Sequence, residues 1–280
     1  MSAAAGAVRA PKAPLRAPKA PRGRKRFTTK QRVVVTIINL AIFCVLWQVI
    51  PTVLDIPRIF LPKLSEIFAQ YPKMIEEGVF FSNVLVSIRI YVVGMVMAIA
   101  VGVPLGLLIG GIRILDKVLL PYLWAVYATP LIVMMPLILL WVGINERARY
   151  LLIIVSAVPA IVVIVMEGIK TVEPSLLRAA RSFGADRRVL FTKVVIPSTI
   201  PFIGTGVKMG MSRGLIGLFV GELFTAATGI GYVIALAGKV FNISRVYAML
   251  LMFVAFSVVM VGLAQYVERR LSVWRSSAVL

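Results

Sequence analysis

Long apolar runs recur along the chain and alternate with short polar segments. Each run is about 20 residues long, which is what a helix needs to cross the roughly 30 Å hydrocarbon core of a bilayer. The runs lack the strict alternation that marks barrel strands, so their backbone polar groups must be satisfied in helices. The pattern predicts an all-α polytopic membrane protein with six transmembrane helices, at about residues 33–50, 84–109, 118–142, 150–168, 201–224 and 246–266.

Two segments between these spans have patterns of their own. Residues 61–78 predict a short amphipathic helix lying on the membrane surface and interrupted near Pro72. Residues 225–241 are apolar but interrupted by glycines, so we predict a re-entrant or surface-lying segment there rather than a span. The apolar face of the first segment consists of Leu64, Ile67, Phe68 and Tyr71.

Small residues and prolines inside the spans predict how the helices pack. The second span carries a face of small residues at intervals of four, which lets another helix approach closely. Prolines inside the second, third and fourth spans are expected to kink them and to free backbone carbonyl groups; they are Pro104, Pro121, Pro130, Pro136 and Pro159. The small residues of the second span are Gly94, Ala98, Gly102 and Gly106.

Composition excludes several classes of protein. Only 15% of the residues are charged, against about 25% in an average soluble domain, and the mean hydropathy is +0.96. The chain has no histidine, and its single cysteine, Cys44, can form neither an internal disulfide nor a cysteine metal cluster. No G-x-x-x-x-G-K-[ST] motif occurs, so we expect this chain to bind no ATP. We therefore expect no catalytic residue, no metal ligand and no cofactor of its own.

The first 32 residues differ from the rest. They contain ten Lys or Arg residues, no acid and four prolines, which predicts a disordered basic tail. Phe27 is the only aromatic residue in this tail, so nucleic-acid bases have no stacking platform and we expect no nucleic-acid partner. The tail is interpreted as a topology signal or as a contact with anionic lipid. Residues 276–280 are a short tail at the other terminus.

The distribution of basic residues predicts the orientation in the membrane. If the N-terminus is cytoplasmic, 21 of the 31 Lys and Arg residues lie in cytoplasmic segments, seven lie outside and three lie within spans. Basic residues accumulate in cytoplasmic loops, so both termini are predicted to be cytoplasmic. The same orientation places the longest basic loop, about residues 170–199, in the cytoplasm.

That loop has signals for two short helices joined by a sharp turn. Glu173 and Pro174 mark a helix start, because proline at the first helical position loses no hydrogen bond. Gly184 is expected to end this helix in a left-handed conformation, and Asp186 is expected to cap the next one. Ile196-Pro197 then leads back towards the membrane. Small residues at the turn would allow the close approach of a partner.

The spacing of this loop resembles the pattern of ABC importer membrane subunits. Their cytoplasmic coupling loop has the sequence E-A-A, three residues, G, nine residues, I-x-L-P, and Ala179-Ala180, Gly184 and Ile196-Pro197 match its spacing. Arg178 stands where the pattern has glutamate. Four further stretches look like the branch that imports nitrate, sulfonates, taurine, bicarbonate and similar anions: LPKLSEIF (61–68), GVPLGLLIG (102–110), PLILLWVGI (136–144) and TGIGYVI (228–234).

The resemblance implies a type I ABC importer permease fold over residues 33–275, in a multi-pass protein of the bacterial inner membrane. It implies that two permease subunits, as a homodimer, form the pore and receive solute from an extracytoplasmic substrate-binding protein. Each would dock its loop on one of two ABC ATPase subunits, which bind the ATP. The coupling residues would be Glu173, Pro174, Arg178, Ala179, Ala180, Ser182, Phe183, Gly184, Ala185 and Arg187.

Charged residues within spans are candidates for the translocation path, because they are unfavourable in lipid. Arg213 lies near the middle of the fifth span, where it either forms a structural pair or lines the path and favours an anionic solute. For the others, snorkelling to the surface, ion pairing or plain packing are alternatives. These other candidates are Lys208, Arg89, Glu222, Met134 and Met135.

Two rival functions remain open at this point. A secondary transporter without an ATPase would need inverted repeats and intramembrane carboxylate relays, and the sequence offers no repeat and few acids within spans. An intramembrane enzyme would need paired acids or an activated nucleophile, which the lack of histidine makes harder to assemble.

Overall fold

The computed structural model describes residues 29–225 and 227–271, and within them every regular element is helical. Among these residues, those up to Leu46 belong to one unit and those from Trp47 onward to a second, which contains the helix bundle. The helices are α1 (Thr29–Val53), α2 (Leu64–Phe68), α3 (Gln70–Glu76), α4 (Val79–Gly111), α5 (Arg113–Ala128), α6 (Leu131–Val142), α7 (Glu146–Lys170), α8 (Pro174–Ser182), α9 (Arg187–Val189), a π-helical turn η1 (Leu190–Val195), α10 (Ile196–Thr225), α11 (Ile230–Lys239) and α12 (Ile243–Leu271).

Within the described residues, five helical segments are long and apolar enough to cross a membrane, and the count becomes six if α5 and α6 together form one span. The prediction of a polytopic helical protein is confirmed, but the third span is not one kinked helix. Its two halves meet at 101°, at Thr129 and Pro130. Proline lacks an N–H and favours an extended residue before it, and Thr129 has φ −72° and ψ 124°. The helix therefore ends at this point and a new one begins.

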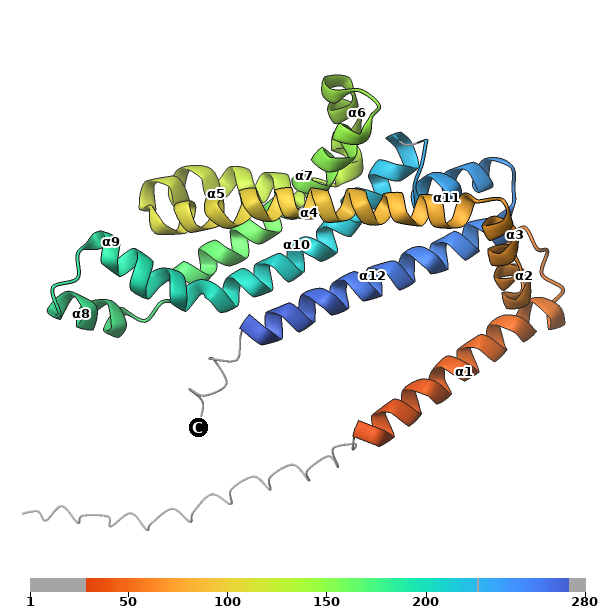
Figure 1. The fold of residues 1–280 in the computed structure, drawn as a ribbon, viewed down its shortest axis with the longest axis horizontal. Coiled ribbons are helices and arrows are strands. Elements are labelled where there is room, and N and C mark those ends of the chain that lie inside the picture. The colour runs from red at the N-terminus through yellow and green to blue at the C-terminus, as the bar shows by residue number, and fades with distance from the viewer. Residues whose placement is uncertain (1–28, 226, 272–280) are drawn as a thin grey trace, which may run out of the picture. The chain divides into compact units, whose positions relative to one another are not determined.

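Helix α7 lies between α4 and α10, and it is the centre of the bundle (Figure 1). The small-residue face predicted on the second span is confirmed, because a Cβ atom on Gly94 would lie 2.8 Å from the side chain of Ile153 in α7. A second glycine face comes from α10, where a Cβ atom on Gly217 would lie 2.6 Å from the carbonyl oxygen of Leu152. Close backbone approach on both sides of α7 therefore depends on residues without side chains.

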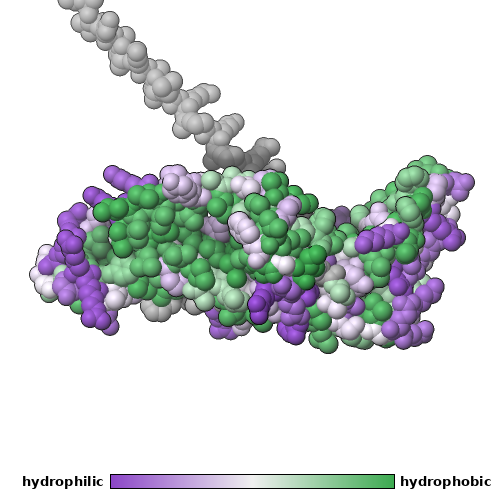
Figure 2. All heavy atoms as spheres, turned by 90° about the horizontal axis from the view of Figure 1, so that it is seen from above, coloured by the Kyte–Doolittle hydropathy of each residue, from purple (hydrophilic) through white to green (hydrophobic). Residues whose placement is uncertain are grey.

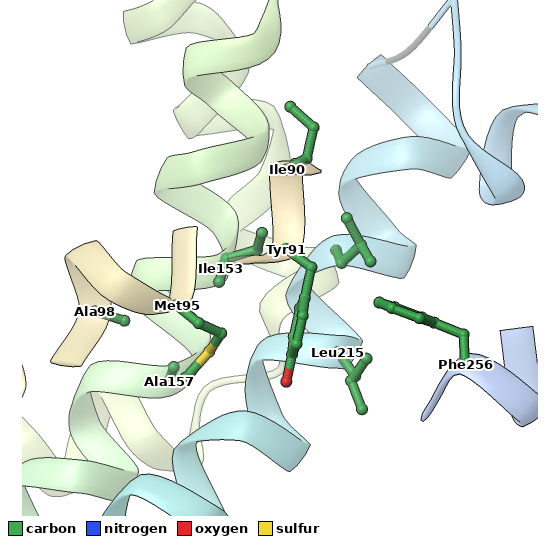
Figure 3. Close-up of a cluster of buried hydrophobic side chains, with 9 residues drawn as sticks. Ile90, Tyr91, Met95, Ala98, Ile153, Ala157, Leu215 and Phe256 are labelled. Atoms are coloured by element: carbon green, nitrogen blue, oxygen red, sulfur yellow. The ribbon is translucent and has the colours of Figure 1, made fainter. Parts of the chain in front are cut away.

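The core between these helices is apolar (Figure 3). Tyr91 of α4 is buried, and its ring meets Phe256 of α12 edge to face, with the ring centroids 5.5 Å apart. The phenol does not remain unsatisfied, because its hydroxyl donates to the carbonyl oxygen of Met211 at 2.8 Å. Buried aromatic hydroxyls usually find such a partner. This bond fixes the register of α4 against α10.

The surface of the bundle is also apolar over a broad area. Figure 2 shows hydrophobic side chains over its middle and hydrophilic ones gathered at the end that carries α8 and α9 and again at the opposite end. Exposed apolar side chains include Val96 of α4 and Val258 of α12. A soluble monomer rarely exposes so large a patch, whereas helices facing lipid do so as a rule.

Several predicted boundaries were wrong. Helix α1 begins at Thr29, inside the predicted tail of residues 1–32, and it runs through Pro51 to Val53, whereas its membrane-length apolar part, Val33–Val53, begins where the first span was predicted. Residues 1–28 and 276–280 of the predicted tails lie outside the described residues. The surface helix of residues 61–78 breaks at Ala69 rather than at Pro72, which lies inside α3. A proline in the first turn of a helix is tolerated because its N–H would have no intrahelical acceptor.

The predicted return to the membrane at Ile196-Pro197 is not a break. One continuous helical segment runs from Arg187 through α9, η1 and α10 to Thr225. The π-helical turn η1 lies directly before Pro197, and wider turns of this kind accommodate a residue that cannot continue the normal hydrogen-bond ladder. The side chain of Thr199 donates to the carbonyl oxygen of Val195 at 2.8 Å, which satisfies one acceptor there.

Candidate functional sites: the α8–α9 turn and the Arg213 cavity

Residues 173–189 comprise α8, α9 and the residues that join them, and they are called the α8–α9 turn from here on. This segment has the geometry predicted from its sequence. Pro174 is the first residue of α8, and Gly184 adopts φ +81° after its end. The N–H of Ala185 donates to the carbonyl oxygen of Ala180 at 3.1 Å, which closes the helix as a left-handed cap requires. Asp186 then accepts a 2.7 Å hydrogen bond from the N–H of Val189 and caps α9. The turn is therefore fixed by local hydrogen bonds.

The α8–α9 turn presents apolar side chains to solvent. Phe183 is 92% exposed, and Leu176 and Val189 are also exposed. Only Leu190, at the base of the turn, is buried. This exposure leaves the aromatic ring of Phe183 open to solvent on an otherwise polar segment.

Positive charge surrounds these apolar side chains. Arg178, Arg181 and Arg187 are all exposed, and the part of the chain that the structure describes offers none of them an ion pair. The carboxylate of Glu173 accepts from the hydroxyl of Ser175 at 3.0 Å. The remaining predicted coupling residues, Ala179 and Ser182, are exposed on α8. All ten predicted residues thus lie on one short segment.

A cavity of about 340 Å³ lies where α5 and α6 meet α7 and α10. Arg213 of α10 lines it, and a guanidinium N–H donates to the hydroxyl of Tyr127 at 3.0 Å. The guanidinium also lies over the Tyr127 ring, 4.7 Å from the centroid. A cation above an aromatic face is stabilised by the quadrupole of the ring. The partner that Arg213 needs is therefore a tyrosine rather than an acid.

No acid neutralises Arg213. All eleven Asp and Glu residues of the chain lie in the described residues, and none of them lines the cavity or forms an ion pair with Arg213. The structure thus gives no support to the interpretation of Arg213 as half of a structural ion pair. It places the charge beside an open space within the membrane-spanning part of the bundle.

Lys208 and Arg89 do not share this cavity. The ammonium group of Lys208 lies 2.6 Å from the carboxylate of Glu268 in α12. Arg89 pairs with Glu146, and both side chains are exposed near the N-terminus of α7. These two cations are held by acids that lie distant in sequence.

Glu222 is fully buried and contacts the start of α11. Its carboxylate accepts from the N–H of Gly231 at 2.8 Å and from the hydroxyl of Ser87. Asn83 and Ser87 of α4 accept in turn from the N–H groups of Gly229 and Ile230, at 2.7 and 2.9 Å. Three side chains from α4 and α10 thereby satisfy the first N–H groups of α11, which a helix N-terminus otherwise leaves unpaired.

Sequence reasoning missed Asn83 and Ser87. Their only signal was that they are polar residues close to or within an otherwise apolar span. The segment of residues 225–241, predicted as re-entrant or surface-lying, contains the short helix α11, which is packed against α12 and α10 with Ile230, Val233 and Ile234 buried. Of the two candidate methionines, Met134 lines the Arg213 cavity, whereas Met135 is buried.

The fold is that of a multi-pass helical membrane protein. The sequence pattern of the family described as "Binding-protein-dependent transport system inner membrane component" matches residues 102–273. Because this is more than half of the chain, the protein belongs to that family of ABC transporter permeases. The matched range contains α7, the α8–α9 turn and α10.

Curated relatives cover nearly the whole chain. The putative aliphatic sulfonates transport permease protein SsuC of Bacillus subtilis is 27% identical, over 91% of this chain and 91% of its own length. The taurine transport system permease protein TauC of Escherichia coli is 24% identical, over 89% and 92%. The riboflavin transport system permease protein RibX of Chloroflexus aurantiacus is 25% identical, over 86% and 90%.

A solved structure confirms the fold. The inward-facing methionine ABC transporter MetNI has a chain that superposes with a TM-score of 0.58 at 18% identity, over 66% of this chain and 92% of that one. The predicted type I ABC importer permease fold is therefore confirmed, and the chain is a membrane component of a transporter rather than an enzyme in its own right.

Proposed function

We propose that this chain is the pore-forming subunit of an ATP-driven importer that carries a small anion inward across the bacterial inner membrane. Two copies would form the pore, and each would dock its α8–α9 turn on one of two ABC ATPase subunits, which bind the ATP. An extracytoplasmic binding protein would deliver the solute. The proposal also retains both termini in the cytoplasm, as the distribution of basic residues indicates.

The observation that carries the proposal is the exposed α8–α9 turn. Phe183 is almost completely exposed on a turn that local hydrogen bonds hold in place. A preformed surface with an aromatic anchor and an arginine fringe suits docking into a groove of a soluble partner. Movement of that partner would reach the bundle directly, because α9 continues without a break through η1 into α10. The turn can thus transmit force from an ATPase to the helix that carries Arg213.

Support for an anionic solute has two parts. Arg213 lines a cavity without an acid to neutralise it. Two of the relatives are named for sulfonates and taurine. The relative named for riboflavin shows that sequence similarity at this level does not fix the solute, so the charge of the cavity is the stronger argument.

Docking is tested by co-purification of this chain with its ATPase subunit. Phe183→Asp should lower the recovered ATPase strongly, because it replaces an apolar anchor by a charge. Phe241→Asp is the matched control, since Phe241 is also exposed, at 72%, but lies between α11 and α12. Equal recovery with both variants would remove the turn from its proposed role.

Orientation is tested separately by cysteine labelling in a Cys44→Ser background. Ser182→Cys lies on the α8–α9 turn, and Glu76→Cys lies at the end of α3. A membrane-impermeant maleimide added to spheroplasts should label Glu76→Cys only, and in inverted vesicles it should label Ser182→Cys only. The reverse pattern would contradict cytoplasmic termini.

A further inference from the structure

We propose that the Arg213 cavity is a binding site for an organic oxyanion, with the charged head at the bend between α5 and α6 and a short apolar tail along α7 and α10. This inference rests on the proposed function for the direction of transport, but the site itself can be tested without an ATPase. Three properties of the Arg213 cavity support the inference: its hydrogen-bond donors, its positive charge and its volume.

Two side chains that line the cavity, Arg213 and Tyr127, carry hydrogen-bond donors and contact each other. One N–H of the Arg213 guanidinium donates to the hydroxyl of Tyr127. Arg213 has no nitrogen atom that is both buried and without a hydrogen-bond partner. The hydroxyl of Tyr127 accepts that bond, and within the described residues it donates to none. Its proton therefore remains available to a ligand. A guanidinium with spare donors binds carboxylate, sulfonate or phosphate oxygens in a forked geometry.

The start of α6 contributes a second source of positive potential. Leu131 and Ile132, its first two residues, both line the cavity. Their N–H groups have no acceptor among the hydrogen bonds of the described residues. The 101° bend at Pro130 places this helix N-terminus at the cavity that Arg213 also lines, where a continuous span would have no helix terminus. A helix N-terminus and an arginine on one cavity act together on an anion.

The rest of the lining determines the kind of anion. Val155 of α7 and Ile216 and Val220 of α10 form an apolar wall. The volume of about 340 Å³ falls at the lower end of small-molecule sites and exceeds what a single inorganic ion fills. The cavity therefore fits an oxyanion joined to a few carbon atoms, such as a short alkanesulfonate or carboxylate. The headgroup of an anionic lipid has the same chemistry, and the experiment must separate the two.

The experiment is calorimetric titration of the full-length chain in phosphatidylcholine nanodiscs, with 1-butanesulfonate as the probe. We expect binding by the wild type, at least tenfold weaker binding by Arg213→Gln and intermediate binding by Arg213→Lys, because lysine keeps the charge but loses the fork. Arg270→Gln is the matched control. Arg270 also lies over a tyrosine ring, that of Tyr266, and donates to its hydroxyl, but it does not line the Arg213 cavity.

Further probes test each part of the proposal. Methanesulfonate should bind about tenfold more weakly or worse, because it lacks three methylene groups that the apolar wall would bury. 1-Butanol and butylammonium should not bind. If Arg213→Gln fails to fold, Tyr127→Phe serves instead, and the loss of one donor should weaken binding about threefold to tenfold.

Three results would overturn the inference. The first is equal affinity of the wild type and Arg213→Gln for butanesulfonate. If Arg213→Gln does not fold, the corresponding result is equal affinity of the wild type and Tyr127→Phe. The second is equal affinity for butanesulfonate and sulfate, which indicates a plain ion site. The third is stabilisation by phosphatidylglycerol that depends on Arg213 without any binding of butanesulfonate, which assigns the cavity to lipid. Normal ATPase docking alongside any of these results would leave the proposed ATP-driven importer standing and would remove only the cavity as an argument for an anionic solute.

Discussion

Replacing Gly184 with valine isolates the contribution of the α8–α9 turn. Gly184 has φ +81°, and an added Cβ atom would have no other atom within 4 Å. The change therefore introduces no clash with the surroundings, and its effect is confined to the left-handed backbone. That conformation costs a residue with a Cβ atom about 1–2 kcal/mol, and a β-branched residue tolerates it least. We expect the affinity for the ATPase subunit to fall about 5–30-fold.

Gly78→Val is the matched control for this prediction. Gly78 has φ +72° and also has nothing within 4 Å of an added Cβ atom, but it precedes α4, distant in sequence from the turn. Both variants should show the same small loss of thermal stability in detergent, and only Gly184→Val should lose ATPase in co-purification. Gly184→Asn should recover much of the docking, since asparagine tolerates the left-handed region. Equal docking by the two valine variants would refute the reasoning.

Three further comparisons test the packing. Glu222→Ala should lower the melting temperature and expose α11 to proteolysis, because each buried donor that loses its acceptor costs about 1–3 kcal/mol; unchanged cleavage would show that the carboxylate does not hold α11. Lys208→Met alone should lower the stability of the protein by a similar amount, because it leaves Glu268 without its partner. The double variant Lys208→Met with Glu268→Met should recover most of this loss, whereas additive losses would argue against the ion pair. Gly217→Ala should separate α7 from α10 and lower stability, while Gly262→Ala, which meets nothing within 4 Å, should be neutral or stabilising; equal effects would contradict the packing of α7.

The spans and the α8–α9 turn were predictable because local chemistry determines them. Span length follows from bilayer thickness, and five of the six predicted runs match long helices. Gly184 and Asp186 take their conformations from bonds to residues three to five positions away, so their roles could be read from a short stretch of sequence.

The partners of the intramembrane charges could not be predicted. Arg213 meets a tyrosine 86 positions earlier, and Glu222 meets Ser87 across 135 positions. Such pairings depend on how the helices are arranged in space, and no local pattern encodes that arrangement. The break at Pro130 had a local signal, but a proline inside an apolar run is compatible with either a kink or a complete break. Pro197 shows the opposite outcome. A proline there suggests a helix boundary, but the helix continues through it, with the π-helical turn η1 just before it.

The most direct test of the account is solute uptake into proteoliposomes that contain this chain, its ATPase subunit and enclosed ATP, with the binding protein added outside. We expect labelled butanesulfonate to accumulate inside only when ATP and the binding protein are both present, and we expect Phe183→Asp, but not Phe241→Asp, to abolish accumulation. Accumulation that proceeds without ATP and follows an imposed ion gradient would contradict the account and identify a secondary transporter instead.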